Sequence, residues 1–215
     1  MQEPTDQTAQ APGSAAPDAE AGARKRPKPG ERRVQILQAL AAMLEKPGAE
    51  RVTTAALAAQ LQVSEAALYR HFASKAQMFE GLIDFIEQSV FTLVNQVAER
   101  DGDGASKAGR IVALVLQFGE RNPGMSRVMV GDALVHENER LQQRMNQFFD
   151  RIELSLRQVL REASAVQQSQ TPTVESQVRA SVLTAFVAGR LQRFCRSGFK
   201  KAPTEALDHA LALLS

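Results

Sequence analysis

The stretch that decides the fold runs from Thr53 to Phe79 and reads TTAALAAQLQVSEAALYRHFASKAQMF. Thr53 and Ser64 each stand directly before a short helical pattern, and Thr and Ser are residue types that cap helix N-termini. We therefore expect one helix over 54–61 and a second over 65–69. Two short helices separated by a turn of about three or four residues have the spacing of a helix-turn-helix.

Helical periodicity continues on both sides of this stretch. Apolar residues recur at three- and four-residue steps, which is typical of amphipathic helices, and no segment shows the alternation of a strand. Proline and glycine mark the helix ends. Further helices are predicted over 31–44, 75–98, the segment between the 101–104 loop and Asn122, 125–134, 138–163, 173–198 and 204–214. The predicted fold class is all-α.

The first thirty residues differ in composition from the rest of the chain. They are rich in Ala, Pro and Gln and contain nothing that would bury a face, so we expect a disordered arm over 1–30. Between Arg24 and Arg33, six basic residues stand against one acid, Glu31. A flexible basic arm can follow DNA phosphates or enter the minor groove, and a solubilising tail is the open alternative.

Composition excludes several classes of function. The formal net charge is only +2, and the single Cys195 has no partner for a disulfide or a metal site, which indicates a reducing compartment and a cytoplasmic protein. No apolar run approaches the ~20 residues that cross a membrane, and 1–22 lack the apolar core of a secretory signal. No phosphate loop, acid pair or metal-ligand spacing is present, so we expect no enzyme activity, no metal and no cofactor.

The second helix of the motif has the chemistry of a DNA-reading element. A recognition helix must lie deep in the major groove, so the small Ala66 and Ala67 permit close approach, and Ser64 and Glu65 are placed to meet base edges. Hydroxyl, imidazole and ammonium groups around the motif can donate to phosphates, although His71 has a structural role as its open alternative. The candidate DNA-binding residues are Thr53, Thr54, Ser64, Glu65, Ala66, Ala67, Tyr69, Arg70, His71 and Lys75.

In order and spacing, this stretch resembles the DNA-binding region of the TetR family of repressors. The resemblance rests on the capping Thr53, LYRHF at 68–72, SK at 74–75 and the long helix that follows. It implies a TetR-like fold in which an N-terminal three-helix helix-turn-helix domain over 31–76 precedes a helical regulatory and dimerisation domain over 77–215. It also implies that the candidate residues named above are DNA-contact positions.

The chain further resembles one subgroup of that family, the SlmA-type nucleoid occlusion factors. VSEAALYRHF at 63–72, FGERNPG at 118–124 and RQVLRE at 157–162 carry this resemblance. It implies a nucleoid-associated protein that binds scattered chromosomal sites and, on DNA, antagonises assembly of the division protein FtsZ, which inhibits septation over the chromosome.

The subgroup resemblance also implies a groove for the C-terminal tail of FtsZ. Phe85, Leu114, Arg121 and Asn122 fall on the helices concerned, and a guanidinium pairs well with the carboxylates of an acidic peptide. The alternative is that Phe85 and Leu114 are core residues and Asn122 is a helix stop. The chain departs from the subgroup pattern at two positions, where Leu93 replaces a basic residue and Gln117 replaces a small one.

The two long late helices, 138–163 and 173–198, show more apolar surface than one small bundle needs. We therefore expect a homodimer in which two helices from each chain form a four-helix bundle. The alternative function is a ligand-responsive TetR-type transcriptional repressor. The apolar helix before Asn122 offers Leu and Val rather than convergent polar groups, so no small-molecule effector is expected.

Overall fold

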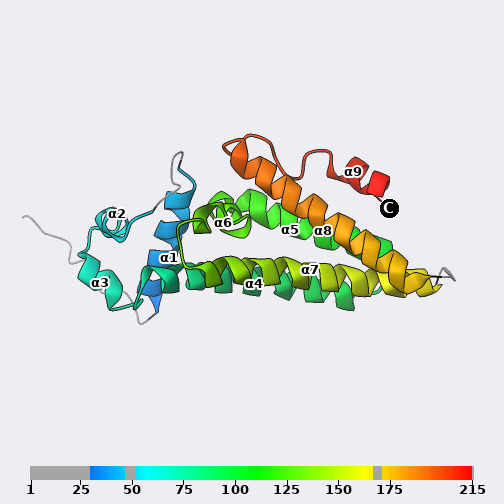
Figure 1. Cartoon of the computed structure of the whole chain (residues 1–215), viewed down its shortest axis with the longest axis horizontal. Coiled ribbons are helices and arrows are strands. Elements are labelled where there is room, and N and C mark those ends of the chain that lie inside the picture. The colour runs from blue at the N-terminus through cyan, green and yellow to red at the C-terminus, as the bar shows by residue number, and fades with distance from the viewer. Residues whose placement is uncertain (1–29, 47–51, 167–170, 215) are drawn as a thin grey trace, which may run out of the picture.

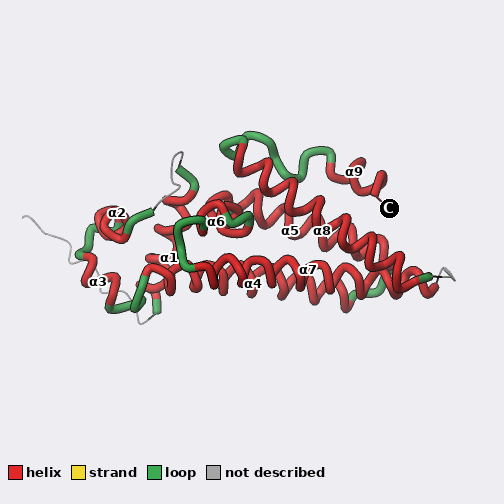
Figure 2. The backbone as a smooth tube through the Cα atoms, viewed as in Figure 1, coloured by secondary structure: helices red, strands yellow, loops and turns green. Residues whose placement is uncertain are grey.

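The computed structural model describes residues 30–46, 52–166 and 171–214, and these parts of the chain contain helices and no strand. Apart from Gly30, the arm predicted over 1–30 lies outside the described residues. Figure 2 shows helices joined by loops over the described residues, which confirms the predicted all-α class. The helices are α1 (Glu31–Leu44), α2 (Thr54–Gln60), α3 (Glu65–Tyr69), α4 (Lys75–Glu99), α5 (Gly104–Arg121), α6 (Pro123–Met129), the 3₁₀ helix η1 (Asp132–Leu134), α7 (Glu139–Val166), α8 (Pro172–Arg196) and α9 (Leu207–Leu214).

Side-chain N-caps begin α2, α3 and α4, and those of α2 and α3 are the two predicted ones. The Thr53 hydroxyl accepts a hydrogen bond from the Ala56 amide at 3.1 Å, and the Ser64 hydroxyl accepts one from the Ala67 amide at 3.2 Å. Ser74 caps α4 in the same way, with the Gln77 amide 3.2 Å away. Each cap satisfies one of the amides that a helix start leaves unpaired and contributes about 1 kcal/mol.

The molecule is elongated, and α1, α2 and α3, which we call the reading head, lie at one end. Figure 1 shows α1, α2 and α3 gathered there, while α4, α5, α7 and α8 extend away from them. α4 joins the two parts, because it packs on α1 near its start and on α5 and α7 further along. α6 packs against α1 so closely that a Cβ on Gly124 would lie 2.1 Å from the Ala41 carbonyl oxygen. The head therefore rests directly on the body.

Some predicted boundaries were wrong where the backbone takes a left-handed turn. The helix predicted over 125–134 is divided, because Gly131 has a φ of 84° between α6 and η1. The helix predicted over 204–214 begins only at Leu207, after Ala206 with a φ of 49°. Left-handed residues interrupt a right-handed helix, and nothing in the apolar periodicity signals them.

Candidate DNA interface

The turn between α2 and α3 is held by backbone and side-chain contacts. Gln62 adopts a left-handed φ of 54°, and the Val63 amide donates to the Ala58 carbonyl at 3.0 Å. The Thr54 hydroxyl donates to the Glu65 carboxylate at 2.6 Å, which ties the start of α2 to the start of α3. Thr54 and Glu65, both predicted to bind DNA, therefore hold each other's side chains in place in the DNA-free protein.

The core of the head lies on the inner side of these helices. Leu57, Leu68 and Phe72 are each 1% exposed, whereas Leu61 is only partly buried at the end of α2. The outer side of α3 is free of the rest of the described chain, and Figure 1 shows α3 at the extremity of the molecule. Its exposed candidates are Ser64, Glu65, Ala66, Tyr69 and Arg70, while Ala67 and His71 are partly buried.

His71 lies just after α3, at the point where the chain contacts α1. The Arg33 guanidinium donates to the His71 carbonyl oxygen and stacks 4.1 Å from the centroid of the Phe72 ring. This contact holds the end of α3 against α1. Arg33, counted among the bases of the N-terminal stretch, is therefore also a packing residue of the head.

Lys75 has a partner that the sequence did not indicate. Its ammonium group donates to the carboxylate of Glu137, which lies between η1 and α7. The Lys75 side chain is 25% exposed and the Glu137 side chain only 11% exposed. Lys75, predicted to bind a phosphate, is thus paired with a carboxylate of the body. The two residues are 62 positions apart in the sequence, so no local pattern could reveal the pair.

Further ion pairs continue along the seam between α4 and α7. A guanidinium nitrogen of Arg140 lies 2.6 Å from a carboxylate oxygen of Glu80. A guanidinium nitrogen of Arg144 lies 2.6 Å from a carboxylate oxygen of Asp84 and 2.8 Å from one of Glu87. The hydrogen bonds that Arg144 donates to Glu87 are the largest cause of a raised Arg144 pKa, and the bond it donates to Asp84 adds to this effect, while burial opposes it. We call these pairs, together with Lys75–Glu137, the α4–α7 seam.

Two family models match the chain. The model described as bacterial regulatory proteins, tetR family, matches residues 36–82. The SlmA-like model, described as a tetracyclin repressor-like C-terminal domain, matches residues 103–215, more than half of the chain. The chain belongs to the SlmA family of TetR-like proteins.

Relatives named nucleoid occlusion factor SlmA align over nearly their whole length. The protein of Photobacterium profundum is 53% identical over 189 residues, covering 87% of this chain and 96% of that protein. The protein of Vibrio cholerae is 52% identical over 185 residues, covering 86% and 94%. SlmA-type membership, with its TetR-type DNA-binding region, is therefore shown by sequence.

Solved structures agree with the fold. FadR from Bacillus subtilis, in complex with stearoyl-CoA, superposes with a TM-score of 0.67 at 14% identity, covering 84% of this chain and 96% of that chain. PfmR from Thermus thermophilus gives a TM-score of 0.67 at 19% identity, covering 85% and 94%. At such low identities, these likenesses show the TetR fold alone.

The residues expected to form a partner groove in this SlmA-family chain lie on α4 and α5. Phe85 is 48% exposed and Leu93 43% exposed, so Phe85 is not a core residue. Leu114 is partly buried and packs against the core. The side-chain amide of Asn122 donates to the Phe118 carbonyl oxygen at 2.8 Å. This bond closes the last turn of α5, so Asn122 acts as a helix stop. Arg121 is exposed and pairs with no carboxylate in the described part of the chain.

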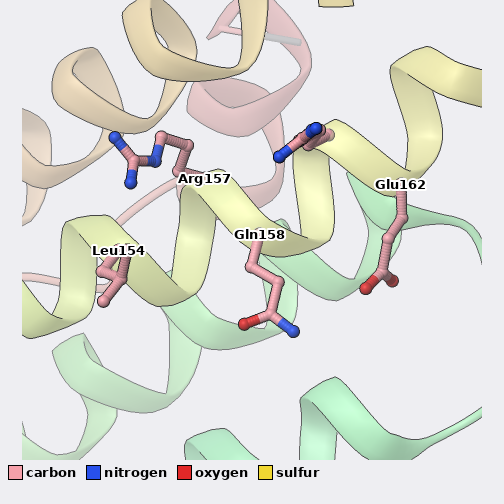
Figure 3. Close-up of a pocket in the computed structure, with 5 residues that line it drawn as sticks. Leu154, Arg157, Gln158 and Glu162 are labelled. Atoms are coloured by element: carbon pink, nitrogen blue, oxygen red, sulfur yellow. The ribbon is translucent and has the colours of Figure 1, made fainter. Parts of the chain in front are cut away.

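A pocket of about 450 Å³ lies along α7. Its described lining is Leu154, Arg157, Gln158, Arg161 and Glu162, all exposed residues of that one helix. Figure 3 shows Leu154, Gln158 and Glu162 projecting to one side of α7 and Arg157 to the other. The described lining of the pocket thus comes from one helix and is exposed.

Over the described residues, no helix is both long and apolar enough to cross a membrane, and no group of His, Cys, Asp and Glu side chains is arranged to hold a metal ion.

Cys195 is expected to be chemically inert in the folded protein. Its side chain is buried on α8, and this burial, aided by Asp132, raises the thiol pKa from 9.0 to about 12. Since the thiolate is the reactive form, iodoacetamide near pH 8 should alkylate the native protein at least ~100-fold more slowly than the protein unfolded in guanidinium. Mass spectrometry over time measures both rates. Equal rates would contradict this burial.

Proposed function

We propose that this chain is a non-enzymatic nucleoid occlusion factor of the cytoplasm. A homodimer binds specific duplex sites on the nucleoid and, when bound, inhibits FtsZ assembly and thereby septation. The observation that carries the proposal is the exposed outer side of α3, borne by a chain that is 53% identical to a named nucleoid occlusion factor. Residues 31–76 would form the DNA-binding domain and 77–215 the regulatory and dimerisation domain.

The DNA half of the proposal follows from the surface of the head. Exposed Ala66 lets α3 approach the base edges, and Glu65, oriented by Thr54, can accept a hydrogen bond from a base amino group. Tyr69 and Arg70 at the end of α3, with Thr53 at the start of α2, can donate to phosphates on either side. Ala67, Ser64 and His71 complete the proposed contact surface.

Replacing Tyr69 with alanine should weaken binding roughly ten-fold at every site, because a phosphate contact carries no sequence information. The side chain is 45% exposed, so the core should not be disturbed. Fluorescence anisotropy with a selected duplex and with a scrambled one measures both affinities. Tyr69→Phe is the matched variant: a loss equal to that of alanine assigns the contact to the hydroxyl, and unchanged affinity in both variants would remove Tyr69 from the interface.

The outer face of α8 supports the homodimer. Val174, Val178 and Val182 recur every four residues and are 61%, 57% and 44% exposed. The exposed Ala185 and Gly189 continue the same side of the helix, so a second helix can approach closely. Contiguous exposed apolar surface marks an interaction site, and we name these five positions the α8 stripe. A second copy would pack its own α7 and α8 against it.

The partner half of the proposal concerns α4 and α5. Arg121 has no carboxylate partner among the described residues and offers its guanidinium to an acidic tail, and Phe85 offers an exposed ring on the adjoining helix α4. Leu114 and Asn122 would line the same groove. Leu93, in place of the basic residue of the subgroup pattern, makes this surface more apolar. Gln117, in place of a small residue, leaves less space in the groove. The test is anisotropy of a labelled FtsZ tail peptide, titrated with this protein bound to its duplex, where saturable binding is expected.

Release of DNA by a small molecule would overturn the proposal that the protein is a nucleoid occlusion factor. A gel shift repeated with a cell metabolite extract separates the two functions, because a ligand-responsive repressor leaves its site and a nucleoid occlusion factor stays bound.

A further inference from the structure

Lys75 stands between the DNA-reading surface and the body. It is the first residue of α4, directly after the Ser74 cap. Its ammonium group donates to Glu137 and lies 5.7 Å from the centroid of the Phe79 ring. The amine is therefore held toward the body by a carboxylate and an aromatic face, not left free beside the head.

Glu137 is itself held in place. Its backbone amide donates to the Leu134 carbonyl at 3.0 Å, which fixes it at the end of η1. Its side chain is only 11% exposed, and Lys75 is the cation paired with it among the described residues. A carboxylate with this little access to water loses much of its stabilisation if its cation leaves.

The buried face of α4, together with the other ion pairs of the α4–α7 seam, holds α4 on the body when Lys75 turns toward DNA. Arg140 with Glu80, and Arg144 with Asp84 and Glu87, fasten the next three turns of α4 to α7. A phosphate beside the head must therefore take the Lys75 ammonium from Glu137 while α4 stays in place. Such an exchange leaves the Glu137 carboxylate partly buried and unpaired, which opposes DNA binding.

From this competition we propose that Glu137 sets the DNA affinity of the reading head by keeping Lys75 off the phosphates. Glu137 touches no DNA in this proposal: it is a positioning residue that acts through Lys75. Any change in the body that moves Glu137 away would release Lys75 and tighten DNA binding. The inference rests on the proposed binding of duplex DNA by α2 and α3.

The test compares Glu137→Gln with the wild type in duplex affinity across a range of salt concentrations. Each additional phosphate contact steepens the plot of log affinity against log salt by about 0.9, so the variant should be steeper by that amount per protomer and roughly five-fold tighter at low salt. Lys75→Ala combined with Glu137→Gln should abolish the gain. Thermal unfolding of each variant confirms that it is folded.

Glu80→Gln is the matched control. It removes one carboxylate from the same seam, but its partner Arg140 lies on α7, so neither slope nor affinity should change. Equal slopes for Glu137→Gln and wild type would overturn the proposal, as would a gain that persists without Lys75. Should Glu137→Gln not fold, Lys75→Ala alone decides: a slope shallower by about 0.9 per protomer would show that Lys75 already contacts phosphate. A wild type that binds no duplex would instead defeat the proposed function.

Discussion

Replacing Val178 with aspartate converts the protein from a dimer to a monomer at micromolar concentration and lowers its affinity for a selected duplex at least about 100-fold. Val178 lies in the middle of the α8 stripe and is 57% exposed in the single chain. In the dimer it would face a second copy, where an aspartate would be buried without a cation. Because a TetR-like dimer reads two half-sites, a monomer loses the second contact.

Sedimentation velocity measures the oligomeric state, and anisotropy measures the affinity. Val135→Asp makes the same substitution at a valine that is 66% exposed but lies outside the α8 stripe, between η1 and α7. This control should remain a dimer. A Val178→Asp protein that sediments as a dimer would show that the α8 stripe is not the interface.

Arg121→Glu should weaken binding of the FtsZ tail peptide about 30-fold or more and leave duplex affinity unchanged, because a like charge facing an acidic tail replaces an attractive pair with repulsion. Arg121 is exposed in the last turn of α5 and has no carboxylate partner in the described part of the chain, so its reversal should not disturb packing. The measurement is peptide anisotropy on the duplex-bound protein.

Arg100→Glu is the control for this charge reversal. Arg100 follows the last residue of α4 and is exposed, at the opposite end of the α4–α5 pair from Arg121. Arg100→Glu changes the net charge by the same amount as Arg121→Glu, and it should keep wild-type affinity for the tail. An Arg121→Glu protein that binds the tail as the wild type does would remove α5 from the partner surface.

The reading head could be predicted because its signals are local. Thr53, Ser64 and Ser74 each cap a helix through an amide three residues along the chain, and the predicted spans 31–44 and 65–69 agree with α1 and α3. Hydrogen bonds over such short separations depend on residue type and spacing alone. The candidate DNA contacts and the boundary between the two domains remain predictions.

The body contains what local patterns could not reveal. Val178 and Val182 share helical periodicity with Leu183 and Val187, yet the first two are exposed and the last two are buried, because α8 buries only one side within its own chain. Periodicity gives the apolar surface but not what covers each side. Similarly, Lys75 has the chemistry of a phosphate ligand, but its pairing with Glu137 depends on how α4 and α7 pack.

The most direct test of the proposed function is sedimentation of FtsZ polymers with GTP, in the presence of this protein, with and without a duplex that carries a selected site. If the protein is a nucleoid occlusion factor, the pelleted FtsZ falls when the specific duplex is present and stays unchanged with a scrambled duplex. Undiminished pelleting, while the folded protein is demonstrably bound to its duplex, would contradict the proposal and favour a TetR-type transcriptional repressor.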